Sequence, residues 1–442
     1  MIIFNLFLTI AIILVLIMKF KAHPAVALFV GALYMGIGSG LGLTTTINTI
    51  TFGFGDMMAS LGFSVAFGVM LGHLLSRTGA VQVIADGIVK LFGKDRAECG
   101  MGLTGFIVSI PVFYDVGFAV LVPLAKTLSK NQKIIPYYTG ALTAGLAIAH
   151  GFIPPTPGPM TAAELVGIEV GTMIFYGILV GLPTMILALT LYYKLFLNRK
   201  GFWNPAKDED PAFELQERGE ELPVDKSPSL ALSLVPIFLP IAMILIGTTA
   251  SALGITDNEI INFVSDKNIA LFVGLLSSMV VAKICGMNRD TIEHELMVAV
   301  ESIGMILFIT GTGGSLATVL QTTGVGDTLV AFVENTSIPP ILFAWLVAWL
   351  IKVAQGSSTV GIITACGLMA PMMNAFDMNP VLIALAAISG TLGACHVNDS
   401  GFWISAKMAG LTTSGGLKAY TLPCLCCSVV SLVIIFILSL FV

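Results

Sequence analysis

The chain of 442 residues is 56% hydrophobic and only 11% charged, with a net charge of −5 at pH 7. A soluble protein carries about 25% charged residues, so this composition argues against a soluble enzyme, a disordered chain or a coiled coil. Thirteen of the charged residues lie between positions 198 and 229. The rest of the chain therefore has so few charges that it must lie mostly in lipid.

Ten apolar runs have the length of a membrane-spanning helix, because about 20 helical residues cross the roughly 30 Å of hydrocarbon in a bilayer. The first run has no basic segment before it and no cleavage pattern after it, so we expect it to be retained as a span. The predicted spans are Ile2–Met18, Pro24–Leu43, Met57–Leu75, Ile134–Met160, Val170–Phe196, Leu230–Leu253, Ile269–Cys285, Val298–Leu320, Val381–Ala409 and Leu417–Val442.

Two further apolar runs are interrupted in the middle: Cys99–Ala125 at Asp115, and Pro340–Met373 at the polar stretch 355–359. Lys and Arg gather on the cytoplasmic side of membrane proteins. If both broken runs enter and leave on the same face, 19 of the 21 basic residues fall on one side. The sequence therefore predicts two re-entrant hairpins, with both termini outside and the charged loop at 198–229 in the cytoplasm.

Short sequence matches recur in order at a nearly constant offset. Residues 27–31 recur at 270–274, an offset of 243, and His150 recurs as His396, an offset of 246. Four such matches favour a duplication, and the odd number of spans before the second copy places the two copies in opposite orientations. Inverted repeats with broken helices are typical of secondary transporters, whose substrate sites lie at the breaks.

The predicted fold is thus an all-α polytopic membrane protein with two inverted repeats, about ten transmembrane helices and two re-entrant hairpins. The first repeat covers 1–197 and contains the hairpin 99–128, which opens to the cytoplasm. After the charged cytoplasmic loop, the second repeat covers 230–442 and contains the hairpin 338–373, which opens to the outside.

The tip of the first hairpin combines a helix breaker with an acidic residue. Pro111 ends the incoming half-helix, and Tyr114 and Asp115 open the outgoing one. A carboxylate at membrane depth costs several kcal/mol unless it is paired, protonated or hydrated. Two interpretations stay open for Asp115: it carries a proton, or it only caps the helix.

The tip of the second hairpin has the composition of an anion-binding helix end. Gly356 is followed by Ser357, Ser358 and Thr359, so that backbone N–H groups, hydroxyls and the helix dipole meet at one point. Lys352 precedes this tip by about one and a half turns. It is expected either to neutralise a carboxylate substrate or to extend outward to the membrane surface.

Each copy contains one more break. Closely spaced prolines follow His150 and surround Thr156, so this stretch cannot continue a helix. The corresponding stretch of the second copy holds His396, Asn398 and Asp399. An asparagine amide both donates and accepts hydrogen bonds, which suits a polyhydroxylated ligand. A lone buried histidine is usually a core group, but two at equivalent positions favour a role in the site.

Nothing in the sequence resembles a catalytic motif such as HExxH or GxSxG. No close-spaced pair of metal ligands occurs either, so we expect no metal. A membrane-embedded enzyme acting on a small hydroxy acid is the alternative from another class. A channel fits less well, because channels line their pores with rings from several subunits.

Three motifs resemble those of the gluconate permease (gluconate–proton symporter) family: His150-Gly-Phe-x-Pro-Pro-x-Pro-Gly-Pro159, Gly356-Ser-x-Thr-Val360 and His396-Val-Asn-Asp-x-Gly-Phe-Trp403. The resemblance covers essentially the whole chain. The family is assigned to the ion transporter superfamily, which implies a scaffold part that dimerises and a transport part that carries both hairpins as an elevator.

The chain departs from the family pattern at three positions. It has Thr156 where many gluconate permeases have histidine, Asp115 where some have glutamate, and Lys352 where some have arginine. These departures keep an anion symporter but leave the substrate open among gluconate, other sugar acids and D-serine. The family's functional residues carry over to Asp115, His150, Ser357, Thr359, His396, Asn398 and Asp399.

We therefore expect an inner-membrane secondary transporter that imports gluconate or a related small sugar acid by symport with protons, without a cofactor. The expected partners are the anionic substrate, membrane lipid and a second copy of the chain in a homodimer, with no nucleic acid. Proton coupling is expected of Asp115 and Asp399. Substrate binding is expected of Tyr114, His150, Thr156, Lys352, Gly356, Ser357, Ser358, Thr359, His396 and Asn398.

Overall fold

The computed structural model describes the whole chain except residues 1, 21, 94–95, 130–133, 211–223, 256, 326–337, 374–378, 394, 397–398 and 442. The described residues form helices and turns, with one isolated β-bridge between Glu209 and Leu411. The predicted all-α class is confirmed.

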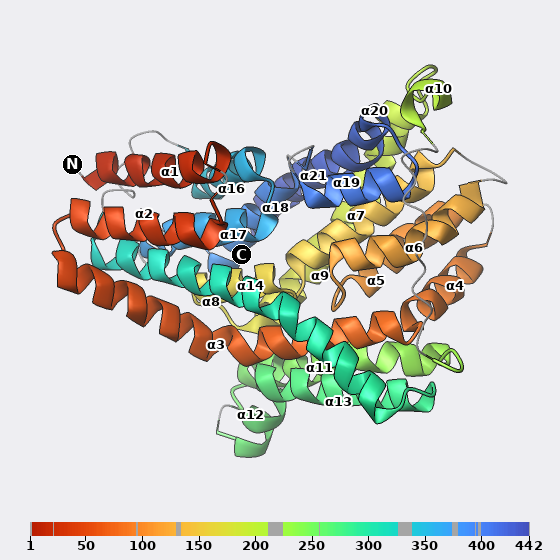
Figure 1. Cartoon of the computed structure of the whole chain (residues 1–442), viewed down its shortest axis with the longest axis horizontal. Helices are drawn as coiled ribbons and strands as arrows, with labels where there is room; N and C mark the ends of the chain where they lie inside the picture. Colours follow the sequence, from red (N-terminus) through yellow and green to blue (C-terminus); the bar gives the residue numbers. More distant parts are fainter. Residues whose placement is uncertain are drawn as a thin grey trace.

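The helices of the first half are labelled in chain order in Figure 1. They are α1 (Ile2–Met18), α2 (Pro24–Gly38), α3 (Leu43–Arg77), α4 (Ala80–Phe92), α5 (Ala97–Val108), α6 (Tyr114–Ser129), α7 (Pro136–Phe152), α8 (Pro157–Val166) and α9 (Val170–Tyr192), which continues as the π-helical turn η2 (Tyr193–Leu197).

The short helix α10 (Pro205–Asp208) precedes the helices of the second half. The described elements of the second half are α11 (Leu230–Ala252), α12 (Glu259–Ser265), α13 (Lys267–Ile284), α14 (Arg289–Thr322), α16 (Pro340–Gln355), α17 (Ser358–Met369), the 3₁₀ turn η4 (Ala370–Met372), α18 (Pro380–Leu392), α19 (Ser400–Met408), α20 (Thr413–Gly416), the π-helical turn η5 (Leu417–Thr421) and α21 (Leu422–Leu438).

Six segments of the described chain are long and apolar enough to cross a membrane. Six more apolar helices are shorter, with 10 to 17 residues, and include the helix before the first predicted hairpin tip and the helices on both sides of the second. Ten crossings and two hairpins stay a prediction. The six spanning-length segments are Leu43–Arg77, Val170–Leu197, Leu230–Ser251, Lys267–Ile284, Arg289–Thr322 and Thr413–Leu438.

Two predicted spans are shorter than the helices that contain them. The predicted span Met57–Leu75 is part of α3, which has 35 residues, and Val298–Leu320 is part of α14, which has 34. The extra turns contain threonine, asparagine and charged residues, so hydropathy alone did not mark them. These turns are helical because α3 and α14 pack against each other along much of their length. In proteins, most of the stability of a helix comes from such tertiary packing.

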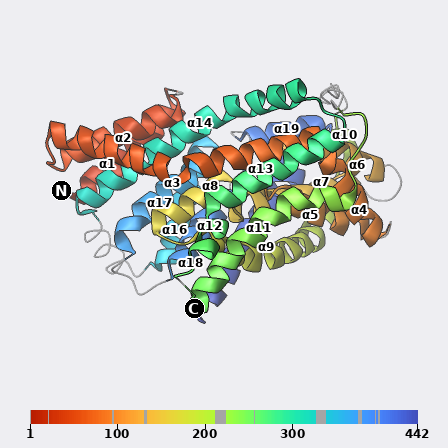
Figure 2. The same ribbon diagram turned by 90° about the horizontal axis from the view of Figure 1, so that it is seen from below.

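The helices fall into two groups that pack mainly among themselves (Figures 1 and 2). The first group contains α1, α2, α3, α11, α12, α13 and α14. The second contains α5 to α9 and α16 to α21. Helix α4 packs against both α5 and α11, and α17 packs against α14, so these contacts join the two groups.

Glycines allow the closest helix contacts within and between the groups. A Cβ on Gly145 of α7 would collide with the Gly102 carbonyl of α5, so these two backbones touch directly. Between the groups, a Cβ on Gly313 of α14 would collide with the Ile363 side chain of α17. Such contacts between small residues are how helices associate closely in lipid.

Candidate substrate site

A cavity of about 370 Å³ lies at the meeting point of the helix breaks. It is lined by residues of both halves of the chain, all within the second helix group. Nine of the twelve predicted site residues line it: Tyr114, Asp115, His150, Lys352, Gly356, Ser357, Ser358, Thr359 and Asp399.

A buried ion pair forms one wall of the cavity. The Lys352 Nζ donates to Asp399 Oδ2 at 2.7 Å and to the Gly356 carbonyl at 2.6 Å. The two side chains are only 2% and 9% exposed. Lys352 therefore does not extend to the membrane surface, and its charge is already neutralised inside the protein. An ion pair this deeply buried is held by further hydrogen bonds, or it would be destabilising.

Those further hydrogen bonds reach Asp399 from two neighbours. Tyr420 Oη donates to Asp399 Oδ2 at 2.9 Å, and the Gly401 N–H donates to Oδ1 at 2.9 Å. Asp399 is the N-cap residue of α19. Together with Lys352, these donors give both carboxylate oxygens a hydrogen-bond partner and hold the side chain in one position.

The break between α16 and α17, predicted as the second hairpin tip, has the expected chemistry of a helix N-terminus. Gly356 adopts a left-handed conformation with φ of 86°, which ends α16, and α17 begins at Ser358. The Ser357 Oγ accepts from the Val360 N–H at 3.4 Å, so Ser357 caps the helix. The N–H groups of Ser358 and Thr359 have no partner within the helix and lie at the cavity wall.

Asp115 is in a different environment from Asp399, although both line the cavity. Asp115 is the second residue of α6, and no described residue donates a hydrogen bond to its carboxylate. Among the described residues, the carboxylate therefore caps no N–H group of α6. Two carboxylates in one cavity, one held by three donors and one unpaired, are arranged for different roles.

His150 lines the same cavity and has one buried ring nitrogen without a partner. Its Nδ1 is buried and has no hydrogen-bond partner among the described residues, and its ring lies 5.4 Å from that of Phe113. Buried polar atoms are nearly always hydrogen-bonded, so this unpartnered nitrogen is an exception that a small rotation of the ring toward the cavity would relieve.

Two of the described predicted residues do not line the cavity. Thr156 is buried, and its hydroxyl donates to the carbonyl oxygens of His150 and Ile153 at 2.7 and 3.1 Å, so it closes the break between α7 and α8. His396 lies in the break before α19 without being part of the cavity wall. Asn398 lies outside the described residues.

Tyr114 lines the cavity, but its hydroxyl has other partners. It is 2.7 Å from Ser405 Oγ and 3.2 Å from Thr143 Oγ1. The ring packs edge-on against Tyr420 at 5.7 Å. Tyr114 thus joins the first hairpin tip to α19, which connects the two halves of the chain at the site.

The sequence pattern does not single out Tyr420, because this residue lies at the start of the apolar run Leu417–Val442, which is predicted to be a span. The only local signal was its position beside Lys418 in an otherwise apolar stretch. The other lining residues that sequence reasoning missed are mostly small or apolar: Phe113, Ala147, Gly151, Thr391, Leu392, Cys395 and Gly401.

The described residues contain no group of three or more His, Cys, Asp or Glu side chains that would hold a metal ion. The chemistry of the cavity is therefore that of one lysine, two carboxylates, a histidine, hydroxyls and helix-end N–H groups.

Solved structures with a similar fold are transporters. The YdaH transporter of Alcanivorax borkumensis aligns with a TM-score of 0.65 at 14% identity, over 94% of this chain and 98% of that one. MtrF of Neisseria gonorrhoeae, described as one of a class of antimetabolite efflux pumps, aligns with a TM-score of 0.62 at 13% identity, over 90% and 85% of the two chains.

Sequence relatives are closer and cover nearly the whole chain. A gluconate permease of Pseudomonas aeruginosa is 33% identical, over 97% of this chain and 95% of its own length. A high-affinity gluconate transporter of Escherichia coli is 32% identical over 92% of both chains. The L-idonate transporter of the Gnt-II system of Escherichia coli is 30% identical over 93% of both.

The GntP family permease pattern matches residues 1–441, which confirms the resemblance found from the three motifs. The matched region contains the apolar helices and every residue of the cavity. The chain therefore belongs to the GntP family of permeases, and it is an integral membrane transporter rather than an enzyme.

Proposed function

We propose that this protein is a secondary transporter of the inner membrane that imports gluconate or a closely related sugar acid together with protons. The observation that carries the proposal is the cavity itself, where a buried lysine, the N-terminus of a helix and a histidine meet. The relatives named for gluconate and L-idonate support this substrate class.

The proposed binding mode follows from these groups. The substrate carboxylate lies at the N-terminus of α17, where the N–H groups of Ser358 and Thr359 and the helix dipole favour an anion. Lys352, paired with Asp399, lies near the end of α16 beside the same helix N-terminus. The hydroxyl groups of the sugar acid pair with the Thr359 hydroxyl and lie against the His150 ring across the cavity.

Charge counting supports coupling to protons. Lys352 and the two carboxylates are the charged residues of the described cavity wall, and Lys352 is already neutralised by Asp399. An anionic substrate adds negative charge to a buried site, which is costly unless a proton enters with it. Asp115 is the proposed carrier, because it takes up a proton without breaking an ion pair. Linkage then makes proton binding and substrate binding favour each other.

The proposed mechanism is an elevator in a homodimer of inverted repeats. It is supported by the division of the helices into two groups, because the whole cavity belongs to the second group and would move with it. The first group would form the scaffold. The proposed orientation, with both termini outside and the charged loop in the cytoplasm, rests on the distribution of basic residues.

Transport by the purified protein in liposomes tests the proposal. Labelled gluconate is expected to accumulate when the external medium is made more acidic than the interior, and unlabelled L-idonate is expected to compete. Dissipation of the pH difference with a protonophore is expected to abolish accumulation but not exchange. Competition by D-serine alone, or accumulation that ignores the pH difference, would contradict the proposed substrate or the proposed coupling ion respectively.

A further inference from the structure

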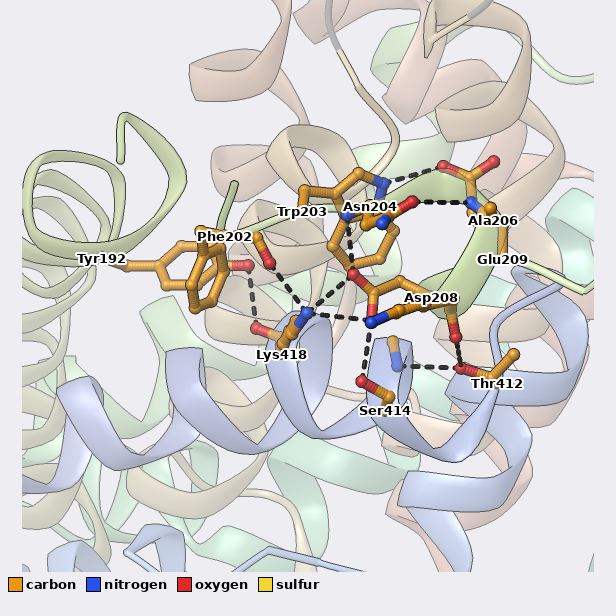
Figure 3. Close-up of polar contacts among 12 residues, drawn as sticks. Tyr192, Phe202, Trp203, Asn204, Ala206, Asp208, Glu209, Thr412, Ser414 and Lys418 are labelled. Carbon is orange, nitrogen blue, oxygen red and sulfur yellow. Dashed lines mark hydrogen bonds and ion pairs between the residues drawn. The ribbon is translucent and has the colours of Figure 1, made fainter. Parts of the chain in front are cut away.

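The charged loop is anchored to the second half of the chain by a buried aspartate (Figure 3). Asp208 belongs to a segment rich in charge, yet its side chain is 0% exposed. Its carboxylate accepts hydrogen bonds from Lys418 Nζ at 2.7 and 2.9 Å, from Ser414 Oγ at 2.7 Å and from the Asn204 N–H at 2.8 Å. We call Asn204, Asp208, Ser414 and Lys418 the loop clasp.

Backbone contacts strengthen the loop clasp on both sides. The Thr412 N–H donates to the Asp208 carbonyl at 3.0 Å, and the Asp210 N–H donates to the Gly410 carbonyl at 2.9 Å. Lys418 Nζ also donates to the Phe202 carbonyl at 2.7 Å and lies 5.3 Å from the centre of the Phe202 ring. The ammonium thus has three hydrogen-bond acceptors fixed by the loop, which leaves it in one position.

Lys418 is part of the π-helical turn η5, and so is Tyr420. A π-helical turn is rare and often marks a functional position. The turn is held from outside on two sides, because Tyr192 Oη donates to the Lys418 carbonyl at 2.9 Å while the Lys418 side chain is held by the loop. The position of η5 therefore depends on residues that lie outside the cavity.

Tyr420 connects the turn to the substrate site. Its hydroxyl donates to Asp399 Oδ2 at 2.9 Å, the same oxygen that accepts from Lys352 at 2.7 Å. A displacement of η5 would move this hydroxyl, and the carboxylate would then be free to turn relative to the ammonium. Hydrogen-bond strength falls steeply with distance and angle, so a small displacement is enough.

We infer that the loop clasp positions the substrate site: the Asp208–Lys418 pair fixes η5 so that Tyr420 orients Asp399 against Lys352. Lys418 is then a positioning residue that acts through Tyr420, although it does not touch the cavity. This inference rests on the proposed function, because its main measurement is the binding of a sugar acid.

A double-mutant cycle with gluconate as the probe tests the inference on the purified full-length chain. Tyr420→Phe removes one hydrogen bond to a charged group, which should weaken gluconate binding about tenfold or more. Lys418→Met should weaken binding by a similar factor. If Lys418 acts through Tyr420, the double variant should bind no worse than Tyr420→Phe alone. Factors that multiply in the double variant, or unchanged binding in Lys418→Met, would overturn the inference.

Two further variants control for folding. Asp208→Asn keeps the shape of the clasp while removing its charge; it should weaken binding in the wild-type background but not in the Tyr420→Phe background. Lys267→Met is the matched control, because Lys267 is also a partly exposed lysine in an ion pair, with Glu164 at 3.3 Å, away from the cavity. Its effect should be near zero and should combine independently with Tyr420→Phe.

The same cycle is also measured without substrate, as the midpoint of thermal unfolding. Non-additive midpoints for Lys418→Met and Tyr420→Phe support the inferred connection through η5 even if gluconate is not the ligand, whereas additive midpoints contradict it. Failure of the wild-type chain to bind gluconate or L-idonate would count against the proposed function alone. The two ideas therefore fail by different results.

Discussion

The Lys352 ammonium lies 2.7 Å from the Asp399 carboxylate, although the two residues are 47 positions apart in the chain. The pair joins the last turn of α16 to the break before α19. An arriving carboxylate therefore meets a lysine that already has an anionic partner. Binding must either share this lysine between two carboxylates or rely more on the N-terminus of α17.

Breaking this pair should destabilise the protein. Lys352→Met leaves Asp399 buried without its cation, and removing one partner of a buried ion pair typically costs about 3–5 kcal/mol. The double variant Lys352→Met/Asp399→Asn should recover most of the lost stability without recovering gluconate binding. Thermal unfolding in detergent and gluconate binding measure the two effects separately. Lys352→Arg keeps the charge and is expected to lose less of both. Equal losses for Arg and Met would indicate packing rather than charge.

The hydroxyls of the second hairpin tip should differ in effect. Thr359→Val removes a hydroxyl at the cavity wall while keeping the side-chain shape, so gluconate affinity should fall about tenfold or more at unchanged stability. Ser357→Ala also removes the cap of α17, so it should cost about 1 kcal/mol of stability in addition. Equilibrium binding and unfolding midpoints are measured for each. Unchanged affinity in Thr359→Val would show that the tip does not hold the substrate.

Replacement of Asp115 should separate exchange from accumulation. Asp115→Asn keeps the size of the side chain but does not titrate, so exchange of labelled for unlabelled gluconate should continue while uptake driven by a pH difference falls to the equilibrium level. Glu164 lies outside this cavity, so the control variant Glu164→Gln should behave as wild type. If Asp115→Asn still accumulates gluconate in response to the pH difference, another residue carries the proton.

The loop clasp predicts acid sensitivity. Burial raises the pKa of Asp208, but the hydrogen bonds from Lys418, the Asn204 N–H and Ser414 outweigh it and hold the pKa below its ordinary value. A lowered pKa contributes stability that is fully present above the unfolded value of about 3.9 and is lost as the pH falls through the folded value. The gap in unfolding temperature between wild type and Asp208→Asn should therefore be constant above about pH 5 and should shrink below about pH 4. A gap that shrinks between pH 8 and pH 6 would show that another group is responsible.

Labelling of single cysteines tests the proposed orientation. Cys99 is the exposed cysteine among the seven of this chain, so Cys99→Ser provides the background. A cysteine at Asp210 should react with an impermeant maleimide only from the cytoplasmic side, and one at Asp257 only from the outside. Labelling of both from the same side would contradict the inverted-repeat topology.

The helix breaks could be predicted because their causes are local. Proline, glycine and short polar residues within apolar runs cannot continue a helix, and α5 ends at Val108, α16 at Gln355 and α18 at Leu392, near the predicted tips and breaks. The same residue types supplied most of the cavity wall. Patterns of this kind identify polar groups at membrane depth without any knowledge of the fold.

The pairing of those groups could not be predicted, because it depends on distances across the fold. The sequence offered Lys352 as a partner for the substrate, whereas the structure pairs it with Asp399. Tyr420 and the Asp208–Lys418 pair were missed for the same reason: Asp208 and Lys418 are 210 positions apart, and nothing in either local sequence indicates the other. Thr156 looked like a ligand residue because of its motif, but its hydroxyl completes the backbone of the break.

The lengths of α3 and α14 have a consequence for the lipid around the protein. Helices of 35 and 34 residues are each about 50 Å long, well beyond the roughly 30 Å of hydrocarbon in a bilayer. Since the two helices pack against each other, they must tilt together or extend together into the headgroup region. Membrane thickness then sets the tilt of the first helix group relative to the bilayer. A change of acyl-chain length in reconstituted vesicles should therefore change the transport rate although the substrate site itself is unchanged.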